Sequence, residues 1–370
     1  MTRGRNECSV EMDAQKRSVG KVGGRQKINT KTKLRRLAPE SRLPIGTKFV
    51  HKQAMDNSSS AHARRGPIQQ WMDNVAEAGV RGVRKEFVRE IKPYVPNGSQ
   101  TAWESEKNFE KNRGCLHMDF ADDDYIHASY VKVDNDLTYI CAQGPMSNTV
   151  QNFWIMIIQE EAKVVLQLCQ PTENGREQSA EYFPMESSAK DYGAVHIKVL
   201  EKPANAIGLK KVTRTKIQAS YGGKTHEVVV EGVLHLLYAG WPDHCVADSP
   251  FVCSAVRGLV HKHFDKKPVI AHCSAGVGRT GTFVAMEMAI SKLKAKEAVS
   301  MCDLVKSLRE QRMGAIQNDQ QYLFVHRMVI EVLLNDDLLI KDLQVINFLK
   351  EYDDLIQRKK LERQRKAMKN

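Results

Sequence analysis

The sequence has 370 residues, of which 42% are hydrophobic and 27% charged, with a formal net charge of +12. This is the composition of a soluble globular protein, and its apolar runs are all shorter than the roughly 18 residues of a membrane helix. The first residues lack the apolar core of a secretory signal, and the 8 cysteines have no zinc-like or redox-like spacing. We therefore expect an intracellular protein, cytoplasmic or nuclear, with reduced thiols.

Residues 1–66 contain 16 Lys and Arg against 5 Asp and Glu, and few aromatic side chains. Because such a segment cannot bury enough apolar surface to order, we expect a disordered basic arm. Its basic run Lys31–Arg36 has two interpretations, a nuclear-localisation or nucleic-acid signal and a merely solvated tail. Residues 358–370 are also basic, with 7 Lys and Arg against 1 Glu. Both ends are therefore candidates to bind acidic partners.

A helical pattern begins at Pro67, with a break predicted near Gly79 and Gly82. The apolar residues at helical intervals are Trp71, Val75, Val80, Val83, Phe87 and Ile91. Strand-like segments follow at 124–131 and 139–145, then a helix over 148–160 and a buried strand over 164–168. Alternating residues at 195–199 and 227–230 predict antiparallel strands with one solvated face. A further strand, 233–238, leads into the loop Gly240–Ser249, and Pro250 starts a helix toward His263.

A buried strand over 268–271, a glycine-rich loop and a helix over 282–288 come next. The glycines of the loop, Gly276 and Gly278, allow about five or six backbone N–H groups to surround a tetrahedral oxyanion at the start of the helix. Cys273, at the loop's start, lies among the same dipoles and the Arg279 guanidinium, which favour its thiolate form. Arg279 suits the bidentate binding of phosphate oxygens. This pattern indicates a cysteine nucleophile that acts on a phosphate-like oxyanion.

Two neighbours of the nucleophile have predicted supporting roles. His272 is expected to orient the loop through a hydrogen bond, because a thiolate needs no base. Thr280 is expected to donate its hydroxyl to the sulfur. The alternative for Cys273 is a buried, inert thiol, but every neighbour fits the anion cradle.

The ten residues His272–Gly281 read His-Cys-Ser-Ala-Gly-Val-Gly-Arg-Thr-Gly. This string resembles the catalytic loop of the tyrosine-specific cysteine phosphatases, and Asp124–Ser129 and Tyr139–Pro145 resemble two further segments of that family. The resemblance covers roughly residues 68–335. It implies hydrolysis of phosphotyrosine in proteins through a phosphocysteine intermediate, with no metal or organic cofactor. It also implies a phosphatase domain over 67–335.

The resemblance assigns roles to the remaining site residues. The phosphate would be bound by the loop residues Ser274, Ala275, Gly276, Val277 and Gly278 together with Arg279. Asp243 would be the general acid that protonates the leaving phenolate, on a mobile flap stiffened by Trp241 and Pro242. Glu173 would pair with Arg279. Gln317 would position the hydrolytic water, and Gln321 would be an accessory glutamine.

The sequence departs from the family pattern at four places. Cys245 and Ala247 stand in the flap where glycine and proline are usual, and Gln178 stands where lysine is usual. In the segment Asn112–Cys115, Gly114 stands where the family has a tyrosine that stacks on the substrate ring, and an aspartate that holds the peptide backbone is missing. Only ten residues separate Arg113 from Asp124, so the tyrosine is either replaced or deleted with a shortened loop. Tyr125 or Phe120 could take the place of the tyrosine. These departures put the rate of turnover and the binding of peptides in question.

The expected fold is an α/β domain in which helices flank a twisted, mixed sheet, with the phosphate loop between a strand and a helix. Residues 336–370 form an amphipathic helix with a basic tail, whose apolar residues are Leu338, Leu339, Leu343, Ile346, Leu349, Tyr352 and Ile356. We expect this helix to pack on the domain of a monomer, with a coiled-coil dimer as the alternative. Two other functions stay open. One is a non-catalytic or weakly active phosphotyrosine-binding protein, and the other is a rhodanese-type sulfur transferase, which has no need of Asp243 or Gln317.

Overall fold

The computed structural model describes residues 66–97, 113–115, 125–186, 188–206, 208–222 and 227–368. The predicted basic arm up to residue 65, with its run Lys31–Arg36, lies outside the described residues. So do Asn112 and the segment 116–124, which contains Phe120. In the part of the chain that is described, no helix combines the length and the apolar character needed to cross a membrane.

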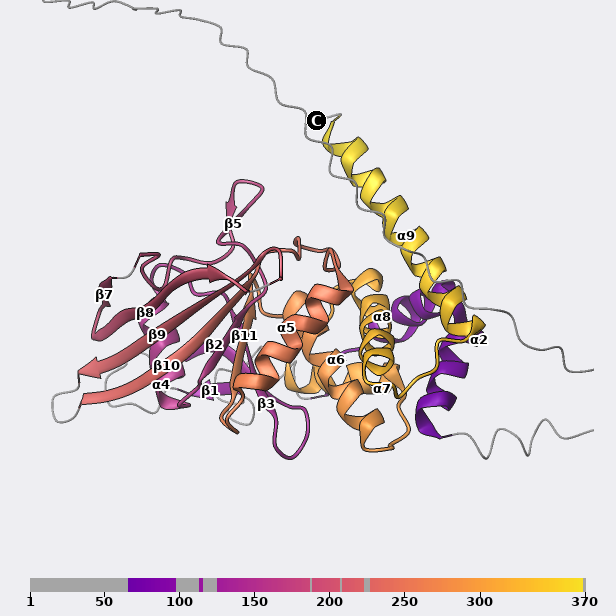
Figure 1. Cartoon of the computed structure of the whole chain (residues 1–370), viewed down its shortest axis with the longest axis horizontal. Helices are drawn as coiled ribbons and strands as arrows, with labels where there is room; N and C mark the ends of the chain where they lie inside the picture. The colour runs from indigo at the N-terminus through magenta and orange to yellow at the C-terminus, as the bar shows by residue number, and fades with distance from the viewer. Residues whose placement is uncertain are drawn as a thin grey trace, which may run out of the picture. The chain divides into compact units, whose positions relative to one another are not determined.

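The described residues form a mixed nine-stranded sheet (Figure 1). In spatial order the strands are β1 (Arg113–Cys115), β2 (Tyr125–Lys132), β3 (Thr138–Gln143), β11 (Val269–Cys273), β4 (Val164–Gln167), β10 (Glu227–Tyr238), β9 (Val212–Gly222), β8 (Val195–Asn205) and β7 (Ala189–Tyr192). The four strands β3, β11, β4 and β10 run parallel, and the outer strands pair antiparallel. A separate hairpin consists of β5 (Thr172–Glu173) and β6 (Arg176–Glu177).

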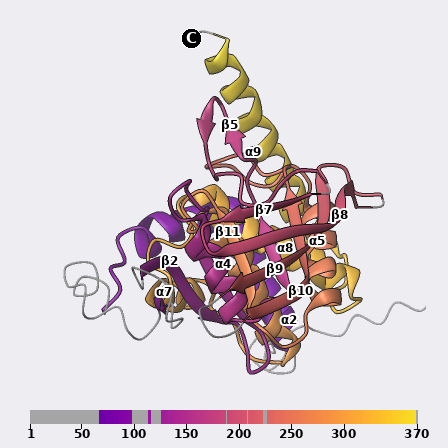
Figure 2. The ribbon, with the colours of Figure 1, turned by 90° about the vertical axis from the view of Figure 1, so that its left-hand side faces the viewer.

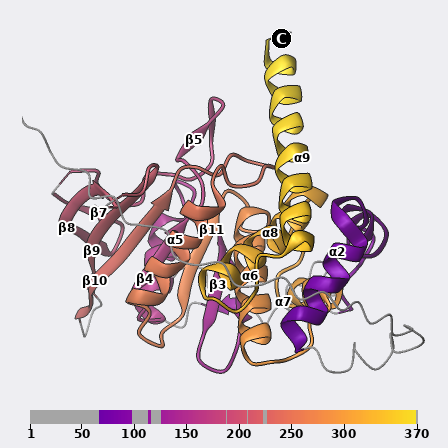
Figure 3. The ribbon, with the colours of Figure 1, turned by 45° about the vertical axis from the view of Figure 1, so that its right-hand side comes forward.

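Helices cover both faces of the sheet, so the predicted α/β fold with a twisted mixed sheet is confirmed (Figures 2 and 3). One face is covered by α4 (Val150–Gln159), which packs on β8, β9 and β10. The helices on the other side are α2 (Pro67–Glu86) with the short η1 (Phe87–Ile91), α5 (Pro250–His263), α6 (Arg279–Lys294), α7 (Met301–Gln311), α8 (Asp319–Asn335) and α9 (Leu343–Ala367).

The alternation of side chains along β11 determines the face of the sheet on which Cys273 lies. Val269, Ala271 and Cys273 belong to the core under α6 and α8, whereas Ile270 belongs to the core under α4. Successive side chains of a strand point to opposite faces. Cys273 therefore lies on the same face as the helix that follows it.

The predicted helix at the start of the described chain is present, and it bends where expected. Gly79 has φ 60 and ψ 175 inside α2, a conformation that favours glycine, and the helix direction changes there. All six apolar residues predicted for this segment are buried.

Two predicted strands, 227–230 and 233–238, are one strand in the structure. β10 runs through both, and its pairing with β9 shifts register between Val230 and Val233. Gly232 has φ 70, so the chain makes a bulge at that point and resumes the strand. The bulge interrupts the period-two alternation of the sequence, and for that reason the pattern predicted two strands instead of one.

The catalytic-loop helix begins three residues earlier than predicted. α6 starts at Arg279, since the Gly278 carbonyl accepts hydrogen bonds from Thr282 N at 2.9 Å and from Thr282 Oγ1 at 2.7 Å. Side chains of a helix lean toward its N-terminus. Arg279 in the first turn therefore leans back toward the loop.

The C-terminal helix α9 packs on α2 and α8, as predicted, and the face that packs includes the predicted Leu349, Tyr352 and Ile356. Its buried residues are Val345, Phe348, Tyr352 and Leu355, whereas Leu343 and Ile346 are exposed. Asp342 sets this register as the N-cap, because its carboxylate accepts a hydrogen bond from Val345 N at 3.0 Å. Leu338 and Leu339 precede the helix and are not part of it.

One core histidine should make the stability of the domain depend on pH. His326 of α8 is buried between the rings of Trp71 and Tyr322, with centroid distances of 6.2 and 4.9 Å, and burial lowers its pKa to about 4. The unfolded chain protonates this residue below about pH 6.5, and the folded protein only near pH 4. Its contribution to stability is therefore complete above pH 6.5 and is lost as the pH falls toward 4.

The variant His326→Phe should remove this dependence while keeping an aromatic ring in the core. Between pH 6.5 and pH 5 we expect the free energy of unfolding, measured with urea, to fall about 1.5 kcal/mol less in the variant than in the parent. The same substitution at the exposed His263 is the control. Equal pH dependence of parent and His326→Phe would contradict the assignment.

Candidate active site

The loop 274–278 between β11 and α6 has its carbonyl groups bound from outside. The carbonyl of Ser274 accepts from Gly144 N at 2.9 Å, those of Ala275 and Gly276 from the Arg312 guanidinium at 3.2 and 3.1 Å, and that of Val277 from Ile316 N at 3.0 Å. Across a trans peptide, a carbonyl and the next N–H point in opposite directions. The N–H groups of residues 275–278 therefore point away from these partners, toward the inside of the loop.

Two glycines of the loop lie close to neighbouring atoms, and the backbone contact makes glycine necessary at Gly276. Gly276 has φ 68, and a Cβ there would lie 2.1 Å from the Ala142 carbonyl oxygen. A Cβ on Gly278 would lie 2.2 Å from Gln317 Oε1. The second contact brings Gln317 to the rim of the phosphate loop.

Arg312 is a site residue that the sequence reasoning missed. Its side chain is buried, and its guanidinium binds two loop carbonyls and Ser129 Oγ. The sequence analysis gave it no role. The available signal was an arginine directly before the loop that carries Gln317, and its fixed set of donors suits the task of binding several carbonyls.

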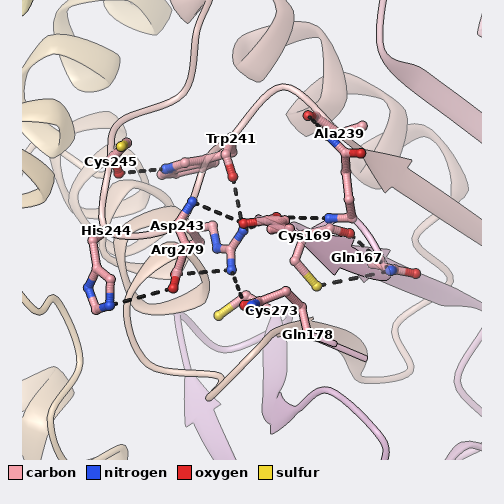
Figure 4. Close-up of polar contacts among 12 residues, drawn as sticks. Gln167, Cys169, Gln178, Ala239, Trp241, Asp243, His244, Cys245, Cys273 and Arg279 are labelled. Atoms are coloured by element: carbon pink, nitrogen blue, oxygen red, sulfur yellow. Dashed lines mark hydrogen bonds and ion pairs between the residues drawn. The ribbon is translucent and has the colours of Figure 1, made fainter. Parts of the chain in front are cut away.

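Arg279 lies at the centre of the site with its side chain almost fully buried (Figure 4). Its Nη1 donates to Glu173 Oε1 at 2.6 Å and to the Trp241 carbonyl at 3.0 Å. Burial alone would lower the pKa of Arg279, but neighbouring Cys273, Cys169 and Glu173 outweigh that effect and raise it. The predicted pair of Glu173 with Arg279 is present.

Asp243 is folded over the loop by the flap. Its Oδ1 lies 3.1 Å from Arg279 Nη2, and its backbone N donates to Glu173 Oε2 at 3.1 Å. Gln178 also reaches Arg279 Nη2, at 3.4 Å, from the opposite side (Figure 4). Glu173 thus holds both the catalytic-loop arginine and the flap.

The flap is fixed at its base by Trp241, which is buried and packs edge-on against Phe324 at 5.2 Å. Trp241 Nε1 donates to the Cys245 carbonyl at 2.9 Å, which closes the turn that carries Asp243. Ala247, where the family has proline, is buried in the same core. That the tryptophan stiffens a mobile flap stays a prediction.

His272 is a neutral orienting residue. It is fully buried, and burial lowers its pKa to about 4. Its Nδ1 faces the Cys273 carbonyl at 3.3 Å, so Nδ1 carries the proton and Nε2 accepts from the Tyr182 hydroxyl at 2.9 Å. The Tyr182 hydroxyl also contacts His235, whose pKa burial lowers to about 3. This buried network fixes the backbone at the nucleophile.

The Thr280 hydroxyl does not bind the sulfur, contrary to expectation. Thr280 lies in the first turn of α6, and its buried Oγ1 has no hydrogen-bond partner within the described ranges.

Gln317 and Gln321 lie together beside Gly278. Gln317 N donates to Gln321 Oε1 at 2.9 Å, and Gln321 Nε2 faces Gly278. That Nε2 and Arg279 Nε are buried donors without a partner among the described residues. Two buried, unpartnered donors beside the loop favour a ligand that accepts hydrogen bonds, as an oxyanion does.

The geometry thus combines a thiol, a ring of backbone donors, a buried guanidinium and a carboxyl group that lies over them. The structure brings Arg279, Glu173, Asp243, Gln317 and Gln321 together at the loop that follows Cys273. Such a site suits nucleophilic attack on a tetrahedral oxyanion with protonation of the group that leaves.

Comparisons with known proteins agree on one family. The family model described as protein-tyrosine phosphatase matches residues 106–331. The match contains β1 through most of α8 and excludes α2 and α9.

Several curated proteins are similar to this chain. It is 34% identical over 228 residues to the rat tyrosine-protein phosphatase non-receptor type 7, covering 58% of this chain and 59% of the relative. It is 32% identical over 216 residues to the rat non-receptor type 20, covering 57% and 50%. For the human receptor-type tyrosine-protein phosphatase C the values are 33% over 216 residues, 57% and 16%. The chain therefore matches less than two thirds of the length of these relatives.

Proposed function

Because the chain belongs to the protein-tyrosine phosphatase family, we propose that it hydrolyses the phosphate ester of phosphotyrosine in proteins through a phosphocysteine intermediate. The observation that carries this proposal is the position of Asp243, 3.1 Å from the same guanidinium that ends the phosphate loop. A carboxyl group at that place lies above the loop that begins at Cys273. The nucleophile and the proton donor thus face one binding site.

In the first step, the Cys273 thiolate attacks phosphorus and the bond from phosphorus to the phenolic oxygen breaks. Asp243 donates its proton to that oxygen, since a phenolate with a pKa near ~10 is a poor leaving group. The loop N–H groups and Arg279 bind the three remaining phosphate oxygens and stabilise the transition state. The entering phosphate replaces the Asp243 carboxylate at Arg279.

In the second step, water attacks the phosphocysteine and the bond from phosphorus to sulfur breaks. Asp243, now a carboxylate, accepts a proton from this water. Gln317 orients the water from the rim of the loop, where its side chain approaches Gly278. The products are phosphate and the regenerated thiolate.

The contacts of Asp243 favour an enzyme over the alternative of a phosphotyrosine-binding protein without activity. Such a protein would need the cradle, but it would have no use for an acid held over the loop by Glu173 and Arg279. A sulfur transferase would likewise have no use for Asp243 and Gln317.

The test is the release of phosphate from a panel of phosphotyrosyl, phosphoseryl and phosphothreonyl peptides and from small aryl phosphates by the purified full chain. Acid quenching during turnover should also trap a phosphate adduct on the peptide that contains Cys273. Binding of phosphotyrosine without any release of phosphate would replace the proposal with the binding protein.

We expect small aryl phosphates to be hydrolysed while phosphotyrosyl peptides bind weakly, with reduced discrimination against phosphoserine. Gly114 lies in β1, which pairs with β2 through Arg113 opposite Ser129 and Cys115 opposite Tyr125. It supplies no ring at the place where the family has tyrosine. The loss of one aromatic stacking partner costs about 0.5–1.5 kcal/mol, and the missing backbone clamp about as much again.

Steady-state kinetics on both substrate classes tests this prediction. Gly114→Tyr should tighten the binding of phosphotyrosyl peptides, and a rise in kcat/KM of about three- to tenfold corresponds to the stacking energy. A kcat/KM of the parent near ~10⁷ M⁻¹s⁻¹ for ordinary phosphotyrosyl peptides, toward the efficient end for enzymes, would contradict it. Another residue, such as Tyr125 or Phe120, would then form the pocket wall.

The remaining expectations stay predictions. They are a cytoplasmic or nuclear location, a monomeric state, a domain over 67–335 and acidic partners for the two basic ends. Of the two basic ends, the structure describes the C-terminal one. Its positive charge favours the acidic residues that flank the phosphotyrosine of a peptide substrate. The basic residues in the last turns of α9 are Arg358, Lys359, Lys360, Arg363, Arg365 and Lys366.

A further inference from the structure

The C-terminal helix α9 contacts the general-acid flap through one side chain. Nη1 of Arg363 lies 2.7 Å from Cys245 Sγ, and its Nη2 donates to Gln320 Oε1 at 2.8 Å. Cys245 is two residues after Asp243 in the flap, and Gln320 is in the first turn of α8, beside Gln321. The Arg363 guanidinium thus connects the flap to the first turn of α8, in which Gln321 binds the backbone of Gln317.

The packing of α9 on the domain determines where Arg363 lies. Tyr352 of α9 stacks on Phe324 of α8 at 6.5 Å, and Arg327 of α8 lies over the Tyr352 ring at 6.0 Å. Arg363 follows Tyr352 by about three helical turns, so both side chains project from the same face of the helix. Figure 3 shows α9 as one continuous helix that rises past the body of the domain. The anchored half of α9 therefore positions the half that contacts the flap.

A second contact joins the same two segments. Asn318 Nδ2 donates to the His244 carbonyl at 3.1 Å, and Asn318 also caps α8. That contact reaches the flap backbone and is independent of the residue at 245. The contact from Arg363 needs a side chain at 245, which the glycine of the usual family pattern would not provide. Cys245 and Arg363 are therefore two features of this chain that depend on each other.

We propose that Arg363 is a positioning residue, which holds the flap through Cys245 so that Asp243 stays over the phosphate loop. The inference rests on the proposed function, since it gives Asp243 the role of general acid. Burial raises the pKa of the Cys245 thiol, so its sulfur is a neutral, weak hydrogen-bond acceptor at neutral pH. The contact should therefore change the rate of the acid-assisted step only modestly, by about three- to tenfold.

The experiment compares Arg363→Ala with Arg365→Ala, which removes the same charge from the same helix about 200° around its axis. The kcat of the full chain is measured on phenyl phosphate and on an aryl phosphate whose leaving group is already acidic. We expect Arg363→Ala to lower kcat about three- to tenfold for phenyl phosphate and to leave the acidic ester nearly unchanged. Arg365→Ala should change neither. Equal losses on both esters, or no loss, would overturn the inference.

A double-mutant cycle tests whether the contact runs through Cys245. Cys245→Gly should cause the same selective loss, and adding Arg363→Ala to it should cause no further loss. Additive losses would assign the effect of Arg363 to something other than Cys245.

A measurement that needs no turnover separates this inference from the proposed function. The loss of the Arg363 cation raises the pKa of the Cys245 thiol, so the alkylation rate is measured across pH and compared per thiolate. On that basis iodoacetamide should alkylate Cys245 several-fold faster in Arg363→Ala than in the parent and in Arg365→Ala, as followed by mass spectrometry. If the parent releases no phosphate from either ester, the proposed function fails, and the alkylation rates still decide whether Arg363 holds the flap. Equal alkylation rates in all three proteins would overturn the inference even in an active enzyme.

Discussion

Replacing Cys273 by serine should abolish turnover while the site still binds phosphate esters. A serine hydroxyl has a far higher pKa than a thiol, and the loop N–H groups and Arg279 do not ionise it. We expect phosphate release to fall by at least about 10⁴-fold, which corresponds to losing covalent catalysis altogether. The binding groups are unchanged, because the loop carbonyls remain held by Gly144, Arg312 and Ile316.

Phosphate release and calorimetric titration of a phosphotyrosyl peptide measure the two parts of this result. Cys302→Ser is the matched control, since Cys302 is a buried thiol of α7 outside the loop. It should keep the activity of the parent. Residual activity of Cys273→Ser within about tenfold of the parent would contradict the covalent mechanism.

Replacing Asp243 by alanine should slow the hydrolysis of phosphotyrosine by ~10²–10⁴. The loss should be far smaller for an ester whose leaving group is already acidic, because such a group departs without a proton. The structure adds a second variant. Asp243→Asn keeps the size of the side chain 3.1 Å from Arg279 Nη2 but has no proton to give, so it should lose as much as alanine on phosphotyrosine.

The rates of both variants on both esters decide the role of Asp243. If Asp243→Ala lost most of its rate while Asp243→Asn kept a near-normal rate, the side chain would serve to hold the flap and not to transfer a proton. Equal losses on both esters would also remove Asp243 from the role of general acid. The KM of both variants should stay close to that of the parent, because a carboxyl group that acts mainly in the transition state contributes little to substrate binding.

The phosphate loop was predictable because its information is local. A buried strand, two glycines and a helix start stand within fifteen consecutive residues, 268–282, and backbone preference alone brings them together. The limits of this reasoning are also local. The helix starts at Arg279 instead of Thr282 because of a hydrogen bond to the Gly278 carbonyl, and the predicted contact of the Thr280 hydroxyl with the sulfur is not formed.

Arg312 shows why some site residues escape a reading of the sequence. It acts by binding the carbonyls on the outer side of the loop. A buried arginine with this task has no motif of its own. Its role depends on which backbone oxygens the fold leaves within reach.

The sequence by itself determined the α/β class and the loop between a strand and a helix, and through resemblance to a family it predicted the nucleophile, the acid and the glutamines. Only the tertiary structure decided which of these groups meet. Arg279 and Glu173 are 106 residues apart, and Arg363 and Cys245 are 118 apart. The order of residues specifies local backbone preference and the period of burial. The distance between remote side chains is set by strand order, by helix register and by the packing of whole faces. For that reason the contact of Arg363 to the flap was decided by the fold alone.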